Sequence, residues 1–206
     1  MQNEKPTKEK IKIAALKLFA EKGLKATTVR DVSHEADVNV SSIIYHFESK
    51  ENLYRTIIEE YSETNSAFAL EVLMNTPENK EEFSIRIKTF SDLLIKSVMK
   101  NPEIHTLMER EFQEGLPYAR EEFSKFLPQV TKKLHQYLLY GQEKKWIRTD
   151  CNCWFIALSF IPLLFQPLKN RFILKEFFNI DTSQPETLSK FSEEIINLLL
   201  NGILIV

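Results

Sequence analysis

The chain contains little glycine, little proline and almost no cysteine, and these shortages limit the folds that it can adopt. Its 206 residues include 4 Gly, 8 Pro and 2 Cys, and no stretch shows the alternation of apolar and polar residues that is typical of half-buried strands. A fold held by several disulfides is therefore excluded, and few residues are available for tight β-turns. Apolar residues instead recur at three- and four-residue spacing, which predicts an all-α protein.

Long apolar runs are also missing. The most apolar stretch, Cys153 to Phe165, is interrupted by Pro162 and is too short to cross the roughly 30 Å of hydrocarbon in a bilayer. The first ten residues are polar and do not resemble a signal peptide. We therefore expect a cytoplasmic protein without a membrane partner.

Catalytic and metal-binding patterns are not found either. The spacing of Cys151 and Cys153 fits neither a usual zinc site nor a redox pair, so we expect free core thiols, with a redox or metal sensor as the alternative. No histidine lies in a nucleophile or metal-ligand motif, so the sequence predicts no enzyme, no metal and no cofactor. The four histidines are His34, His46, His105 and His135.

Charge is distributed unevenly along the chain. The net charge is −2 overall. Residues 1–55 contain 10 Lys and Arg against 8 Asp and Glu, a net of +2, whereas the remaining residues contain 17 against 21, a net of −4. A mildly basic head on an acidic body is compatible with DNA binding through one end, although the asymmetry is weak evidence on its own.

Residues 27–53 have the pattern of a helix-turn-helix. Thr28 and Asp31 form a capping-box sequence that opens a short helix, and Asn39 is a suitable N-cap for a second one. The second helix of such a motif lies in the major groove of DNA. The apolar face of the pair is formed by Val29, Val32, Ala36 and Ile43.

This stretch resembles the DNA-binding domain of the TetR family of bacterial transcriptional regulators. The resemblance implies a helix-turn-helix domain at residues 1–55, linked by a helix at 50–74 to a helical regulatory and dimerisation domain at 56–206. The matching residues are Thr7, Ile11, Ala14, Ala15, Leu18, Phe19, Gly23, Thr28, Val29, Val32, Ala36, Val38, Ile43, Tyr45, His46, Phe47, Lys50, Glu51 and Leu53.

Three positions depart from the family pattern. Asp37 replaces the usual glycine of the turn, and Asp tolerates the left-handed conformation better than most residues. Ser41 replaces a frequent glycine and adds a hydroxyl near the groove. Ile44 replaces a common tyrosine, which removes one expected backbone contact and offers a contact to a thymine methyl group.

The resemblance assigns DNA contacts to eight residues. Base reading is expected from Arg30, Val40, Ser41 and Ser42, and backbone contact from Thr28, Tyr45, His46 and Lys50. The alternatives are a packing role for His46 between helices and a solvated Lys50 beside Glu51. Phosphate contact or simple solvation remains open for Lys5, Lys8, Lys10 and Lys12.

Further helices are predicted along the body. Gly23 ends the first helix of the chain, and Pro128 bends a long later helix unless it begins a new one. The apolar stretch 151–168 either faces a partner or forms the central core helix of the domain. The predicted helices span about 7–22, 50–74, 79–99, a short one from 102, a long one ending near 145, 151–168 and 185–203.

The family resemblance implies a homodimer through residues 151–168 and 185–203. Two recognition helices roughly 34–36 Å apart then match a palindromic operator in double-stranded DNA. It also implies a site for a small hydrophobic or amphipathic effector, although each candidate residue can equally be plain core. The candidates are Phe83, Phe90, His105, Met108, Glu109, Phe112, Phe123, Phe126, Trp154 and Phe155, with Arg110 and Gln113 as further polar handles.

The expected function is that of a ligand-responsive transcriptional repressor. Two alternatives stay open at this point. One is a helical ligand-binding or interaction protein that no longer reads DNA, and the other is a transcriptional activator.

Overall fold

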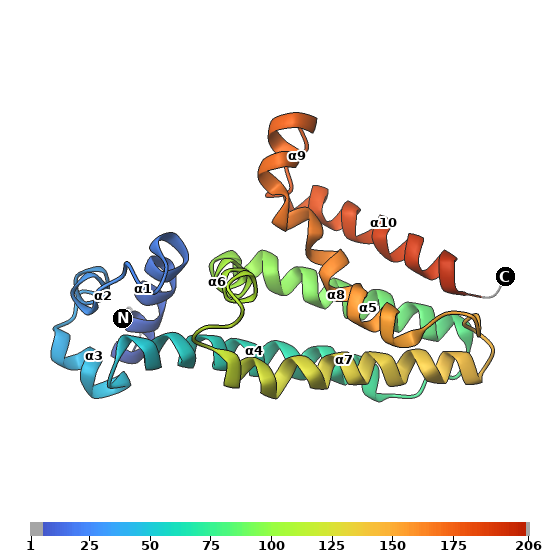
Figure 1. Ribbon diagram of the computed structural model, residues 1–206, viewed down its shortest axis with the longest axis horizontal. Helices are drawn as coiled ribbons and strands as arrows, with labels where there is room; N and C mark the ends of the chain where they lie inside the picture. Colours follow the sequence, from blue (N-terminus) through green and yellow to red (C-terminus); the bar gives the residue numbers. More distant parts are fainter. Residues whose placement is uncertain (1–5, 205–206) are drawn as a thin grey trace, which may run out of the picture. The chain divides into compact units, whose positions relative to one another are not determined.

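The computed structural model describes residues 6–204, apart from the side chains of residues 65, 66 and 69. Within this range the chain is helical, as predicted, and contains no β-sheet; an isolated bridge joins Ile147 to Leu204 (Figure 1). The helices are α1 Thr7–Lys22, α2 Val29–Ala36, α3 Val40–Phe47, α4 Lys50–Met74, α5 Lys80–Lys100, α6 Pro102–Gln113, α7 Arg120–Glu143, α8 Cys153–Lys169, α9 Arg171–Phe178 and α10 Pro185–Ile203.

The packing divides the chain into two compact units that are not continuous in sequence. The first unit consists of residues up to 64 together with 101–126, and the second of 65–100 together with 127–206. The predicted two-domain division near residue 55 stays a prediction. The packing differs from it in that α6 and the start of α7 belong with the helix-turn-helix, because Ile104 and Leu107 are buried in its core.

The core of the first unit is built from the apolar faces of α1 to α4, with residues of α6 and of the segment that leads into α7. The predicted stripe of α1 is buried, and so are Ile43 and Phe47 of α3. Helix α4, which follows the recognition helix in the sequence, contributes Leu53, Tyr54 and Ile58 to the same core. This arrangement explains why two helices of eight residues each are stable, since such short helices need tertiary burial.

The turns of the first unit follow the sequence pattern closely. Thr28 Oγ1 accepts from the Asp31 N–H at 3.1 Å, and Asp31 Oδ2 accepts from the Thr28 N–H at 2.8 Å, which confirms the capping box. Asp37 has a φ of 51° and a ψ of 52°, the left-handed conformation expected for the turn. Gly23 has a φ of 82° at the end of α1.

The second unit packs α10 and α8 against α5, with part of α7 completing its core. Phe83 stacks on Tyr137 with ring centroids 4.8 Å apart, and Phe90 contacts Phe160. Pro128 lies inside α7 and does not begin a new helix. The bounds of α5 and α7 differ from the prediction by one or two residues at their ends.

Helix α8 has one buried and one exposed apolar face. Ala157, Phe160 and Leu164 are buried, whereas Phe155 and Leu158 are 72% and 59% exposed. Helix α9 was not predicted; it has no buried residue and carries Phe172, Ile173, Phe177 and Phe178 on its surface. Among the described helices, none has the length and apolar character required to cross a bilayer.

Candidate nucleic-acid interface

The recognition helix α3 presents an outward face next to a buried one. Ile43 is fully buried and Phe47 nearly so, whereas the neighbouring Ile44 is 45% and Tyr45 85% exposed. Val40, at the start of the helix, is 39% exposed. The buried pair fixes the helix to the first unit, so the other side chains are free to meet a groove.

The hydroxyl groups of the predicted base readers are held by one acceptor. Asn39 Oδ1 accepts from Ser41 Oγ and from Ser42 Oγ, each at 2.9 Å. Asn39 lies at the N-cap position as predicted, but its side chain makes no bond to the helix backbone. That role of Asn39 is corrected: it orients the two serines, and their lone pairs remain available as acceptors for base donors.

The predicted contacts of α2 lie at its exposed start. Arg30 is exposed, and Thr28 is exposed as the N-cap residue. Thr28 Oγ1 donates to Asp31 Oδ2 at 2.8 Å in addition to accepting the Asp31 N–H. Its hydrogen is therefore engaged, which leaves its remaining lone pair and the backbone for an incoming partner. The Thr28 hydrogen bonds also hold the pKa of the Asp31 carboxyl below its ordinary value.

Tyr45 and His46 point their rings into the open. The two rings are in edge-to-face contact with centroids 5.1 Å apart. His46 is exposed, and its ring is 6.2 Å from that of Phe47. The alternative of a purely interhelical packing residue therefore does not fit His46, and its predicted contact with the DNA backbone stays a prediction.

Lys50 has a structural role in addition to its predicted contact with DNA. Its ammonium donates to the carbonyl oxygens of Leu24 at 2.9 Å and Thr27 at 2.8 Å. Two of its three hydrogens are thus used to close the loop between α1 and α2. This arrangement does not fit the alternative of a solvated lysine. The predicted contact of Lys50 with the DNA backbone stays a prediction, for which the third ammonium hydrogen remains.

The basic residues of α1 also differ from one another. Lys12 forms ion pairs with Glu9 at 2.6 Å and with Glu60, so its charge is used within the first unit. Lys8 lies over the Phe47 ring, 5.8 Å from its centroid. Lys10 is exposed, and Lys5 lies outside the described residues. Lys8 and Lys10 therefore remain the α1 candidates for phosphate contact.

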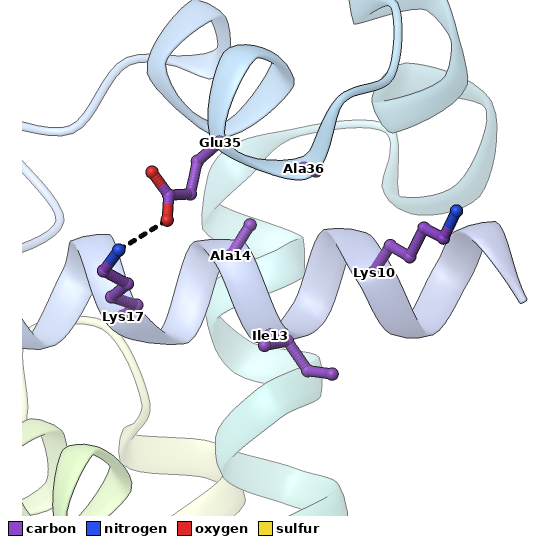
Figure 2. Close-up of a pocket in the computed structure, with 6 residues that line it drawn as sticks. All are labelled: Lys10, Ile13, Ala14, Lys17, Glu35 and Ala36. Carbon is purple, nitrogen blue, oxygen red and sulfur yellow. Dashed lines mark hydrogen bonds and ion pairs between the residues drawn. The ribbon is translucent and has the colours of Figure 1, made fainter. Parts of the chain in front are cut away.

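A shallow depression of about 270 Å³ lies between α1 and α2 (Figure 2). Ile13, Ala14 and Ala36 form its apolar part. An ion pair of 2.6 Å between Lys17 and Glu35 joins the two helices at its edge, and this contact lowers the pKa of the Glu35 carboxyl and raises that of the Lys17 ammonium. The pair reinforces the packing of α1 on α2 that supports the recognition helix.

The predicted effector residues are divided between the two units, and neither of the two depressions described here is lined by any of them. Within the second unit Phe83 and Phe90 are core residues, and Trp154 stacks on His135 with centroids 3.9 Å apart. A second depression, of about 220 Å³ between α5 and α10, is polar and contains none of the candidates. The candidates in the first unit are His105, Met108, Glu109, Phe112, Phe123 and Phe126, and those in the second are Phe83, Phe90, Trp154 and Phe155.

The polar handles expected on α6 are mostly engaged. Glu109 Oε1 accepts from Gln113 Nε2 at 3.2 Å, and Phe112 packs against Phe123 with centroids 4.7 Å apart. Arg110 donates to the end of α1 and is not a free handle. The contact of Arg110 with the end of α1 was not predicted, because nothing local in the sequence of α1 or α6 indicates that the two helices meet.

The two cysteines are free thiols, as expected. Cys153 is buried and Cys151 partly so. Burial raises the pKa of the Cys153 thiol, which lowers the thiolate content that redox or metal chemistry requires. Among the described residues no group of three or more His, Cys, Asp or Glu has the geometry of a metal site.

Comparison with known proteins agrees with this fold. The chain is 23% identical over 192 residues to the biofilm operon icaADBC negative transcriptional regulator IcaR of Staphylococcus epidermidis, covering 93% of this chain and 96% of that protein. It is 24% identical over 201 residues to the transcriptional repressor NicS of Pseudomonas putida, covering 96% and 92%. A shorter match to the probable regulator YttP of Bacillus subtilis is 42% identical over 57 residues, 28% of each chain.

Solved structures of similar fold extend over the whole chain. The ketosteroid transcriptional regulator KstR2 of Mycobacterium tuberculosis has a TM-score of 0.74 at 20% identity, covering 98% of this chain and 96% of the other. The fatty acid degradation regulator FadR of Bacillus halodurans has a TM-score of 0.75 at 16% identity and covers 98% of both chains. At these identities the likeness is one of fold.

Two family descriptions match separate parts of the sequence. Residues 13–57 match the bacterial regulatory proteins of the tetR family, and residues 86–199 match the tetracyclin repressor-like C-terminal domain. The first covers the helix-turn-helix with its outward-facing recognition helix, and the second covers more than half of the chain. The protein therefore belongs to the TetR family of transcriptional regulators.

Proposed function

We propose that this regulator is a repressor that binds palindromic operator DNA as a homodimer and is released by a small apolar or amphipathic effector. The observation that carries the DNA-binding part is α3, with Tyr45 at 85% exposure beside the fully buried Ile43. Tyr45, His46, Thr28, Lys8 and Lys10 contact the sugar-phosphate backbone in this proposal. Base reading comes from Arg30, Val40, Ser41 and Ser42, and the protein acts in the cytoplasm.

The proposed dimer forms through α8 and α10. Regulators of this family act as dimers, and both helices carry exposed apolar side chains in the second unit. On α8 these include Phe155 and Leu158, and on α10 Leu198 is 76% exposed. Covering such side chains with a second copy removes apolar surface from water, which favours association by about 25 cal/mol per Å² before the costs of binding.

The proposed effector is apolar or amphipathic. The chain contains 15 Phe residues, and two proteins of similar fold are described by their names as a ketosteroid transcriptional regulator and a fatty acid degradation regulator. Helix α4 extends from the first unit into the second and is the element through which an effector would act. Moving the balance of two states from 1:99 to 99:1 requires about 5.5 kcal/mol of difference in effector affinity between them.

The decisive test is selection of random duplex DNA by the purified protein at moderate salt. A palindrome with half-sites about one helical turn apart is expected. Placing that palindrome upstream of a reporter then separates repression from activation. A folded dimeric protein that recovers no motif would contradict the proposal and favour the interaction-protein alternative.

A further inference from the structure

The carbonyl end of α1 is closed by a side chain from α6. Arg110 donates from Nη1 to the Phe19 carbonyl oxygen at 2.8 Å and from Nη2 to the Ala20 carbonyl oxygen at 3.1 Å. The last carbonyls of a helix lack intrahelical partners, and a cation placed there also meets the negative end of the helix dipole. Arg110 therefore caps a helix that lies 91 residues earlier in the chain.

Gly23 leaves the space that this cap requires. Its φ of 82° favours glycine, and a Cβ at this position would lie 2.9 Å from Arg110 Nη1. The Gly23 N–H donates to the same Phe19 carbonyl at 2.9 Å. Glycine thus ends α1 and also admits the guanidinium against its last turn.

The carboxylate of Glu111, the residue after Arg110, binds α4 and the segment that leads into α7. Glu111 is 2% exposed, and its Oε1 accepts from the Tyr54 hydroxyl of α4 at 2.9 Å. Its Oε2 accepts the backbone N–H groups of Tyr118 and Ala119 at 3.2 and 3.1 Å. A buried carboxylate is retained at such a position only when its lone pairs are satisfied, and this one has three donors.

The contacts of Arg110 with Phe19 and of Glu111 with Tyr54 are linked by a contact between the Phe19 and Tyr54 rings. The Tyr54 ring packs edge-on against the Phe19 ring, with centroids 5.3 Å apart and an interplanar angle of 71°. Arg110 holds the backbone of Phe19, and Glu111 holds the tyrosine that packs on its ring. Consecutive residues of α6 therefore fix α1 and α4 to each other, and these are the helices that flank the helix-turn-helix in sequence.

We infer that Arg110 is a positioning residue for operator binding, which it supports by setting the position of α1 against α4 and so the position of α3. The inference rests on the proposed operator binding. Since hydrogen bonds to a charged donor contribute more than neutral ones, loss of this cap is expected to reduce the preference for operator over mixed-sequence DNA by about tenfold. Binding to mixed-sequence DNA depends on phosphate contacts and is expected to change much less.

The test compares Arg110→Gln with Arg110→Lys and with Arg120→Gln as the matched control. Arg120 is exposed in the same unit and carries the same charge, and its guanidinium reaches the Gly115 carbonyl at 3.5 Å, not α1. Two quantities are measured below the unfolding temperature of every variant. One is the ratio of affinities for the selected operator and a mixed-sequence duplex, and the other is amide hydrogen exchange across residues 19–24.

Arg110→Gln is expected to speed exchange at the end of α1 and to lower the affinity ratio, while Arg120→Gln changes neither. Arg110→Lys retains the charge and is expected to rescue part of both effects. An unchanged affinity ratio in Arg110→Gln, with or without faster exchange, would overturn the positioning role. Failure of the unmodified protein to select any duplex is a separate result, and it would remove the proposed function together with this inference.

Discussion

The ammonium group of Lys50 lies 2.8 Å from the carbonyl oxygen of Thr27 and donates a hydrogen bond to it. Thr27 is itself fully buried, and its hydroxyl donates to the Gly23 carbonyl at 2.8 Å. The loop that joins α1 to α2 is therefore closed from its far side by the first residue of α4. Lys50, which the family resemblance assigns to the DNA backbone, is therefore also expected to contribute to the stability of the fold.

Replacing Lys50 with Gln is expected to lower the free energy of unfolding by about 1–2 kcal/mol, because the loop carbonyls lose a charged donor. Denaturant unfolding measures this change, with Lys25→Gln as an exposed control that is expected to be neutral. If Lys50 instead bound a phosphate, the substitution would reduce the slope of DNA affinity against salt concentration by about 1. That smaller slope, with stability unchanged, would show that Lys50 acts on DNA.

Asn39→Ala is expected to alter base preference more than overall affinity. The substitution releases Ser41 and Ser42, whose hydroxyls both donate to Asn39 Oδ1 at 2.9 Å. Freed hydroxyls can rotate and donate to base acceptors, so positions read by the two serines should become less selective. Repeating the duplex selection with the variant checks this, with Ser42→Ala as a comparison. An identical motif from Asn39→Ala would contradict the orienting role.

Leu158→Glu is expected to raise the dimer dissociation constant by more than tenfold, as loss of a well-packed interface residue often does. Leu158 is 59% exposed in the single chain, so the fold itself should tolerate the change. Ile85→Glu is the matched control, since Ile85 is 60% exposed on α5 of the same unit and outside the proposed interface. Sedimentation velocity over a range of concentrations distinguishes them. Equal effects of both substitutions would argue against an α8 interface.

Alkaline pH is expected to destabilise the protein through two buried tyrosines. Burial, reinforced by the charge of Glu111, raises the pKa of Tyr54 well above its ordinary value of 10.0, and burial likewise raises the pKa of Tyr137. A folded-state pKa above the unfolded one gives stability that is complete below about pH 10 and declines as pH rises further. Tyrosinate absorbance from this pair should therefore appear together with unfolding.

Substitution by Phe identifies the source of the late tyrosinate signal. Tyr54→Phe and Tyr137→Phe should each reduce its amplitude, while loss of helical circular dichroism at high pH reports the unfolding step. If neither substitution reduced the late amplitude, the two buried phenols would not be its origin. The result applies to the fold and is independent of any DNA ligand.

The helices of this protein were predictable because their signals are local. Thr28 and Asp31 lie three residues apart, so a capping box can be recognised in the sequence and forms wherever that segment is helical. The turn at Asp37 and the end of α1 at Gly23 follow from backbone conformations that few residue types tolerate. Helix α9 was not predicted: it has only eight residues and none of them is buried, and Asn170 at its N-cap position makes no side-chain capping bond.

The partners of polar side chains were decided by the tertiary structure. Apolar periodicity predicts which face of α6 is buried, but it does not say that this face meets α1 and α4. The hydrogen bonds that Arg110 donates to Phe19 and that Tyr54 donates to Glu111 span 91 and 57 residues, and no local propensity describes contacts over such separations. The sequence thus determined where helices begin, end and turn, whereas only the packing decided that α6 supports the DNA-binding unit and that Lys50 closes a loop.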